Sequence, residues 1–135
     1  MAIYVFEGTI GLKTIEWKNI QTIGMNSFKE STGLESVIIP LTVKSIGTSS
    51  FEECSGIENL SIGSGITEIS EKAFKGCSGF TTLTIPDQVT TIGKQSFSGC
   101  SKLETLIFGN QLQTIGQESF SNCKVEIHVW HYYLD

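Results

Sequence analysis

Apolar residues recur along the chain at a constant interval of 23 residues. Three columns of identical residues show the interval: Phe28, Phe51, Phe74, Phe97 and Phe120; Ile23, Ile46, Ile69, Ile92 and Ile115; Cys54, Cys77, Cys100 and Cys123. Self-similarity at such a period is typical of a solenoid, in which a repeat cannot bury its apolar side alone and stacks on its neighbours. The pattern therefore predicts a right-handed parallel solenoid of about five coils with the phenylalanine rings stacked inside.

A second apolar set indicates where each coil contains a strand. Its members are Leu34-x-x-Val37-x-Ile39, Ile57-x-x-Leu60-x-Ile62, Phe80-x-x-Leu83-x-Ile85 and Leu103-x-x-Leu106-x-Phe108. This alternation favours a short parallel strand with every second side chain pointing inward. Pro40, Gly63, Pro86 or Gly109 follows at once, and we expect it to end the strand.

Two further sides complete the predicted coil. A second short strand is expected in segments such as "VTTIG", with Val89 and Ile92 pointing inward. The third side, "KQSFSGC", is predicted to be a helical turn, because Phe97 and Cys100 are three residues apart and would share one face. Between them, a corner glycine is expected to supply a positive φ angle in most coils, at Gly24, Gly47, Gly93 and Gly116, with Ser70 in its place in one coil.

The period also fixes the expected boundaries within one repeat domain, residues 1–135. Coils start near residues 12, 34, 57, 80 and 103, with a partial repeat over 1–11 and a terminal strand and tail over 125–135. The phase reaches back to "FEGTIGLKTI", which aligns with "FKESTGLESV" from Phe28. Because terminal repeats normally carry a polar cap and none is visible, we expect a fragment of a longer array; the alternative is that residues 2–6 form a makeshift cap.

The stretch "LTIPDQVTTIGKQSFSGCSKLETLIF" resembles the BspA-like, or treponemal-class, leucine-rich repeat. The resemblance covers Phe6 to Cys123; serine replaces the usual alanine beside most of the phenylalanines, and Thr9 and Ser31 replace cysteine. It implies a leucine-rich-repeat solenoid of β-rich coils and a surface or secreted adhesin that binds host matrix proteins or other microbes. Cell surface or secreted localisation is thus an expectation of the resemblance, with a cytoplasmic location as the alternative.

The charge and hydropathy of the chain argue against nucleic-acid and membrane partners. The net charge is −5 and all nine basic residues are lysine, so the bidentate arginine contacts favoured for phosphate and guanine are unavailable. We therefore expect no nucleic-acid partner. No apolar run approaches the roughly 18 residues needed to cross a bilayer, so no membrane insertion by this segment is expected.

No catalytic, metal or cofactor site is predicted. Zinc-binding cysteines lie two to four residues apart, whereas these recur every 23 residues and favour a ladder of small buried thiols. A metal site formed by Cys123, His128, His131 and Asp135 is disfavoured, because no other coil contributes a ligand. The same two histidines are the only ones in the chain, and no G-x-S-x-G motif presents a nucleophile. The chain is therefore predicted not to be an enzyme.

The outward residues of the main strands form the candidate protein-binding face. They are Glu35, Ser36, Ile38, Glu58, Asn59, Ser61, Thr81, Thr82, Thr84, Glu104, Thr105 and Ile107. Such columns make a flat, rigid surface that loses little entropy on binding, and Ile38 and Ile107 supply its apolar spots. The glutamates predict a lysine- or arginine-rich patch on the partner.

Three functions compete at this point. An adhesion module that binds a host matrix or cell-surface protein comes first, from the resemblance and the missing catalytic groups. An intracellular structural or scaffolding array is the alternative, because unpaired thiols persist best in reducing compartments. An ice- or crystal-binding face ranks third. Stacked threonines would suit that function, but here glutamate and isoleucine interrupt the threonine columns.

Overall fold

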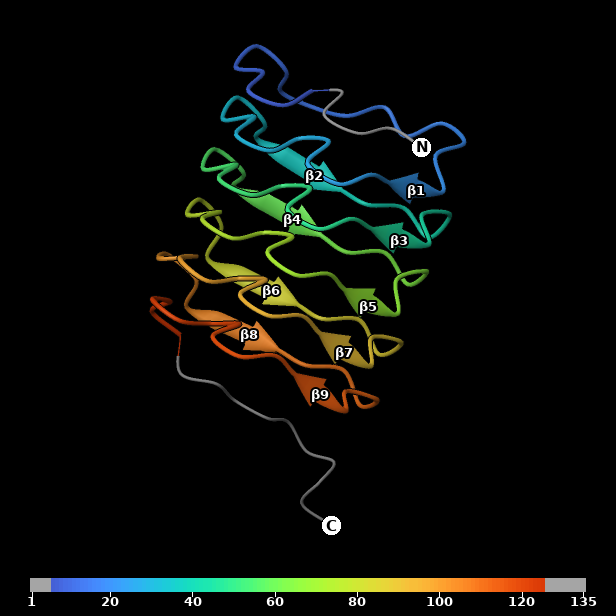
Figure 1. The fold of residues 1–135 in the computed structure, drawn as a ribbon, viewed down its shortest axis with the longest axis vertical. Helices are drawn as coiled ribbons and strands as arrows, with labels where there is room; N and C mark the ends of the chain where they lie inside the picture. The colour runs from blue at the N-terminus through green and yellow to red at the C-terminus, as the bar shows by residue number, and fades with distance from the viewer. Residues whose placement is uncertain (1–5, 126–135) are drawn as a thin grey trace.

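Two columns of short parallel strands run along a stack of coils in the computed structural model, which describes residues 6–125 (Figure 1). The first column contains β2 (Ser36–Ile38), β4 (Asn59–Ser61), β6 (Thr82–Thr84) and β8 (Thr105–Ile107). The second contains β1 (Thr22–Ile23), β3 (Ser45–Ile46), β5 (Glu68–Ile69), β7 (Thr91–Ile92) and β9 (Thr114–Ile115). Paired residues are 23 apart, as Val37 and Leu60 are, so the predicted parallel solenoid is confirmed.

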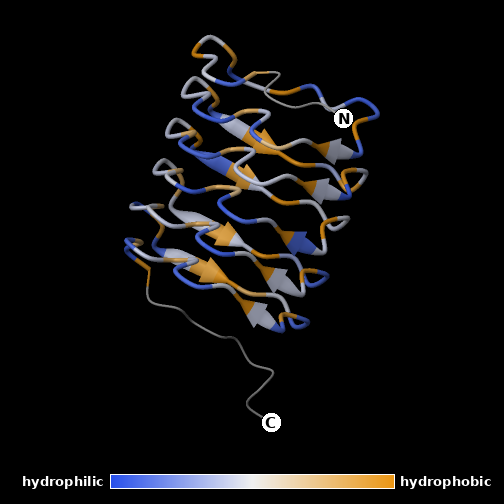
Figure 2. Ribbon diagram, viewed as in Figure 1, coloured by the Kyte–Doolittle hydropathy of each residue, from blue (hydrophilic) through white to orange (hydrophobic). Residues whose placement is uncertain are grey.

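Inward-pointing residues of both columns form one continuous core. Val37, Leu83 and Leu106 are at most 1% exposed, and Val89 and Ile92 are fully buried, as the alternation predicted. Apolar residues recur at equivalent places in successive coils (Figure 2). The terminal strand predicted over residues 125–135 lies, apart from Val125, outside the described residues.

A ladder of stacked phenylalanine rings runs through the core. Adjacent centroids are 5.1–5.4 Å apart and adjacent ring planes differ by 2–8°, from Phe6 through Phe28, Phe51, Phe74, Phe97 and Phe120. The prediction that the phenylalanine column stacks inside is confirmed. A centroid distance above 5 Å with near-parallel planes is the offset arrangement that aromatic pairs prefer.

The prediction of a helical turn on the third side is wrong. Residues 6–125 contain no helix, and the chain makes two successive turns there, with Ser49 and Glu53 at φ angles of 57° and 60°. These left-handed residues redirect every second amide out of the coil. The N–H groups of Ser49, Phe51 and Glu53 donate to the next coil, at N···O distances of 3.1, 2.8 and 2.6 Å to the carbonyls of Glu71, Ala73 and Lys75. A helix would keep those amides within the coil. The third side instead forms a third ladder of backbone hydrogen bonds between neighbouring coils.

The corner glycines also differ from the prediction, because none of them has a positive φ. Positive φ falls two residues later, at Asn26, Ser49, Lys72, Gln95 and Glu118, and four residues after that, at Glu30, Glu53, Gly76, Gly99 and Asn122. The corner glycines instead allow close stacking. A Cβ on Gly47 would lie 2.6 Å from the amide nitrogen of Met25, and one on Gly93 would lie 2.8 Å from that of Glu71.

Ser70 shows what a side chain does at this corner. The amides of Gly47 and Gly93 donate to the carbonyls of Ile23 and Ile69 in the preceding coil, both at 2.7 Å. At Ser70 the hydroxyl makes this bond to the Ile46 carbonyl instead. β3 and β5 are accordingly not paired, whereas β1 pairs with β3 and β5 with β7. The Cβ therefore interrupts the backbone ladder, and the hydroxyl satisfies the acceptor.

Buried serines beside the phenylalanines fall into two groups. Ser27 and Ser119 donate to the carbonyls of Gly24 and Gly116, the glycines three residues before them. The hydroxyls of Ser50 and Ser96 are buried without a hydrogen-bond partner. A buried hydroxyl without a partner costs free energy relative to a methyl group of similar size.

Phe74→Ala should lower the free energy of unfolding by about 3–5 kcal/mol, because its fully buried ring packs between two other rings. Phe6→Ala should cost much less, because the Phe6 ring is 40% exposed and stacks on one described ring only. Urea titrations of both variants measure the difference, and equal losses would contradict the stacked core.

Ser50→Ala and Ser96→Ala should each raise the free energy of unfolding by about 1 kcal/mol, because each removes an unsatisfied buried hydroxyl. Ser119→Ala is the matched control and should be destabilising, since its hydroxyl is hydrogen-bonded. Thermal unfolding of the three variants is the measurement. Destabilisation by all three would show that the hydroxyls of Ser50 and Ser96 have partners in solution.

Candidate protein-binding face

The predicted face residues lie together on one side of the stack, on or beside β2, β4, β6 and β8. All of them are exposed except Ser36, which is partly buried. Ile38 is 55% exposed and Ile107 is 36% exposed, so both present apolar surface to solvent. Parallel pairing places Ser36 opposite Asn59 and Thr82 opposite Thr105. The face is therefore a set of short columns fixed by backbone pairing.

Glu35, Glu58 and Glu104 form one column of the face, and lysines pair with two of these glutamates. Lys13 Nζ lies 2.8 Å from Glu35 Oε1, and Lys124 Nζ lies 2.8 Å from Glu104 Oε1. The hydrogen bond from Lys124, followed by its charge, lowers the pKa of Glu104, and the hydrogen bond to Glu35 raises the pKa of Lys13. Glu58 has no ion pair within residues 6–125. It is thus the uncompensated acid of this column, and sequence reasoning overlooked that Lys13 occupies the same column one coil earlier.

The main strand column is split in the middle. β2 pairs with β4 and β6 pairs with β8, but no hydrogen bond joins β4 to β6. Leu60 on β4 is partly exposed, whereas the equivalent Val37, Leu83 and Leu106 are buried. The sheet therefore opens between two coils whose third sides remain bonded, as from Phe74 N–H to the Ser96 carbonyl at 2.8 Å.

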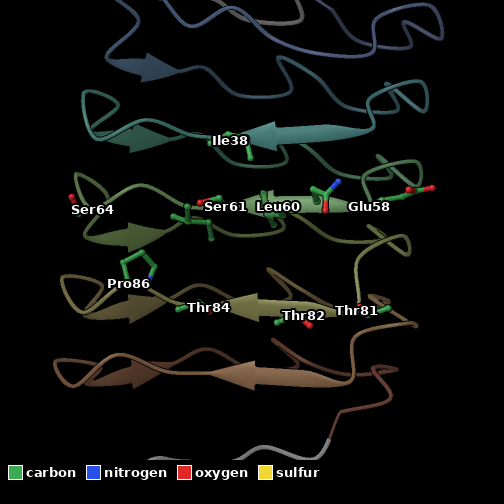
Figure 3. Close-up of a pocket in the computed structure, with 11 residues that line it drawn as sticks. Ile38, Glu58, Leu60, Ser61, Ser64, Thr81, Thr82, Thr84 and Pro86 are labelled. Atoms are coloured by element: carbon green, nitrogen blue, oxygen red, sulfur yellow. The ribbon is translucent and has the colours of Figure 1, made fainter.

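A groove of about 620 Å³ occupies the split (Figure 3). It is lined by Ile38, Glu58, Asn59, Leu60, Ser61, Ile62, Ser64, Thr81, Thr82, Thr84 and Pro86. Glu58 and Thr81 lie at one end, Ser64 and Pro86 at the other, and Leu60 between them (Figure 3). Seven of the predicted face residues line this groove, while Leu60, Ile62, Ser64 and Pro86 were not predicted.

Phe80 lies in the coil at the split and is larger than its counterparts in the other coils. It is the first inward residue of the coil that carries β6, in the column of Leu34, Ile57 and Leu103, and it is 1% exposed. An aromatic ring in a column of isoleucine and leucine needs more width in the core, and a close-packed interior yields by shifting backbone. The sequence shows the larger residue, but not that the strands above it separate.

The cysteine column has a structural role in the described residues. All four thiols are free; Cys54, Cys77 and Cys100 are fully buried and Cys123 is partly buried. Each Sγ–H donates to the carbonyl of the phenylalanine 26 residues earlier, as Cys54 does to Phe28 at 2.9 Å. Ser31 continues the column, because its hydroxyl donates to the Phe6 carbonyl at 2.5 Å. The predicted thiol ladder is confirmed, and serine can replace cysteine because either residue supplies the donor.

Burial makes these thiols poor nucleophiles. It raises the pKa of Cys54 to about 12 and that of Cys77 well above its ordinary value. The hydrogen bond with Cys123, followed by burial, raises the pKa of Cys100. The same hydrogen bond lowers the pKa of the half-buried Cys123. Cys123, the only partly buried thiol of the column, is thus its most accessible one.

Residues 6–125 hold no group of three or more histidine, cysteine or acidic side chains placed to bind a metal ion. His128, His131 and Asp135 lie outside the described residues. The described part of the chain also has no helix that could cross a membrane.

Comparison with known families decides the assignment. The BspA type leucine rich repeat region matches residues 1–127 in six copies. This chain belongs to the BspA-type leucine-rich repeat family. No curated protein matches the sequence.

Two solved structures resemble the BspA-type chain in sequence and fold. A leucine rich cell surface protein from Faecalibacterium prausnitzii A2-165 is 29% identical, with a TM-score of 0.76 over 85% of this chain and 32% of its own. A leucine-rich repeat protein from Bacteroides ovatus ATCC 8483 is 27% identical, with a TM-score of 0.56 over 82% of this chain and 37% of its own. The chain thus spans about a third of the length of each.

A third structure, the pneumococcal vaccine antigen PcpA, shares the fold. It is 22% identical, with a TM-score of 0.63 over 82% of this chain and 32% of its own.

Iodoacetamide at pH 8 should modify Cys123 first and leave Cys54, Cys77 and Cys100 unmodified in the folded chain. Those three are buried and have raised pKa values, whereas Cys123 is half-buried and has a lowered pKa. Peptide mass spectrometry of native and urea-unfolded samples gives the order of modification. Equal labelling of the four cysteines before unfolding would contradict the buried ladder.

Proposed function

We propose that this chain is a non-enzymatic protein-binding module of a surface or secreted BspA-type leucine-rich repeat protein. Its partner would be a host matrix or cell-surface protein that contacts the strand face. The observation that carries this proposal is the fixed array of exposed polar residues and isoleucines over β2, β4, β6 and β8. Solenoids use extended surfaces of this kind for binding, and a preorganised face loses little entropy when a partner docks.

Two further observations support the proposal. The structure from Faecalibacterium prausnitzii is described as a cell surface protein, which favours the same location for this relative. Ile38 is a large apolar side chain exposed at 55% on a rigid strand, where it can be desolvated at small entropic cost. The alternative, an intracellular scaffold, is favoured by the free thiols, because reducing compartments preserve unpaired cysteines.

The test is a binding screen of the purified chain against immobilised matrix and cell-surface proteins. Ile38→Arg should weaken binding of the best hit by about tenfold or more, because it places a charge in the apolar contact. Leu41→Arg is the matched control, since Leu41 is an exposed aliphatic residue, 63% exposed, that lies outside the four face strands. Rising salt should also weaken binding, through the unpaired Glu58.

Loss of binding in the Ile38 variant alone would support the strand face. Equal binding by both variants, with no salt dependence, would place the contact elsewhere on the chain. Absence of any partner, together with recovery of the native protein from the cytosol, would favour the scaffold.

A further inference from the structure

The interrupted ladder between β4 and β6 leaves groups of both strands without a backbone partner. Where β6 pairs with β8, the Thr105 N–H donates to the Thr81 carbonyl at 3.0 Å. The equivalent groups one coil earlier, the Thr82 N–H and the Glu58 carbonyl, form no such bond. We call the gap that these groups face the seam, with β4 on one side and β6 on the other.

Donors and acceptors line both sides of the seam. The Ser61 carbonyl accepts from the Ile39 N–H at 2.9 Å, so Ser61 points its backbone groups toward β2. Because backbone groups alternate between the two sides of a strand, those of Leu60 point toward β6. By the same alternation, Thr82 and Thr84 point their N–H and C=O groups toward β4.

The width of the seam limits what can enter it. β4 and β6 remain neighbours in their column, and their Cα atoms come within 8 Å of one another (Figure 1). A polypeptide strand between them would need about twice the usual strand spacing of about 4.8 Å, so none can enter. One bridging oxygen lengthens a direct N–H···O bond by about 2.8 Å, which takes the spacing to about 7.6 Å. The seam therefore has room for single hydrogen-bonding atoms and not for a chain.

The chemistry of the walls selects the kind of atom. An N–H group needs an acceptor and a C=O group needs a donor, and both kinds occur on each wall. A hydroxyl oxygen accepts and donates at once, whereas an ammonium group only donates and a carboxylate only accepts. Hydroxyl groups therefore suit the seam best.

Polar side chains border the seam on the outer face of the strands. Those that line the groove and are exposed include Asn59, Ser61, Thr82 and Thr84. The partly exposed Leu60 lies among them and adds apolar surface (Figure 3). A ligand site of this kind fixes its ligand with a few polar groups and packs apolar surface against the rest.

The groove over the seam carries no cation. None of the residues that line it is basic, and Glu58, its one charged residue, has no ion pair within residues 6–125. A carboxylate can accept hydrogen bonds from two hydroxyl groups, but it repels an anionic ligand. The groove therefore favours an uncharged hydroxylated ligand over an acidic one.

We propose that the groove over the seam binds an uncharged saccharide, which places hydroxyl oxygens in the seam between Leu60 and the threonines of β6. A saccharide carries hydroxyl groups around a ring with apolar C–H groups, so it matches both the seam and the Leu60 side chain. At about 620 Å³, the groove falls within the range of about 300–1,000 Å³ that is usual for small-molecule sites. This site goes beyond the protein-binding function proposed above, because its ligand is a sugar chain.

The experiment applies the fluorescently labelled chain to a printed array of neutral and sialylated glycans. The neutral glycan with the strongest signal is then titrated as a free oligosaccharide by calorimetry. Thr82→Val should weaken binding by about fivefold, because it removes one hydroxyl beside the seam and keeps the branched shape. Thr105→Val is the matched control and should change binding by less than about twofold, since Thr105 is exposed and pairs with Thr82 but does not line the groove.

NMR chemical shifts of the backbone amides locate the saccharide without depending on a variant. The amides of Leu60, Thr82 and Thr84 should shift most when the free oligosaccharide is added. Shifts at these amides, with weaker binding by Thr82→Val than by Thr105→Val, support the proposal. Absence of glycan binding, binding of acidic glycans alone, equal effects of the two variants, or shifts elsewhere would overturn it.

Amide hydrogen exchange tests the seam itself in the free chain. The Thr82 amide should exchange at least about tenfold faster than the Thr105 amide, because only the latter donates to a carbonyl of the neighbouring coil. Equally slow exchange of both amides would show that β4 and β6 pair in solution, which would remove the site.

The saccharide site and the protein-binding function fail in different ways. A protein partner that is lost with Ile38→Arg, in a chain that binds no glycan, would retain the strand face and overturn the saccharide site. A neutral glycan that shifts the seam amides, with no protein partner in the screen, would retain the saccharide site and overturn the protein-binding function.

Discussion

Register between coils is the constraint on which the rest of this structure depends. Where strands pair, each coil lies one strand spacing from the next, with each residue over its equivalent 23 positions away. Backbone hydrogen bonds fix that distance on the strands and on the turn-rich third side. The aromatic ladder then follows, because rings held at equivalent positions can only stack.

The same constraint explains the residues at the coil corners and in the polar columns. Gly47 and Gly93 leave no room for a side chain between adjacent backbones, so glycine there serves close approach. The cysteine column provides one donor per coil for a phenylalanine carbonyl, and Ser31 does the same with a hydroxyl. In both columns, the position requires a small group with defined hydrogen bonding, and the chemical identity of that group is secondary.

Departures from perfect repetition create the features that distinguish this chain from a uniform solenoid. Ser70 replaces a backbone bond with a side-chain bond, and the strand ladder is interrupted between β3 and β5. The ladder is also interrupted between β4 and β6, and the opening there is the groove that Glu58 flanks. A repeat fold thus acquires a local groove with no change in the 23-residue spacing.

The period and the alternation by themselves determined the parallel stack, the inward residues such as Val37 and Phe74, and the outward face that contains Ile38 and Glu104. These are properties of single residues repeated in phase, so they can be read from the chain. The tertiary structure alone decided that the third side is not helical, because its amides bond to the neighbouring coil. It also decided that Lys13 and Lys124 neutralise two glutamates and that β4 separates from β6. Those features depend on distances between coils, and a distance between coils is set by the volumes packed in the core rather than by the local pattern.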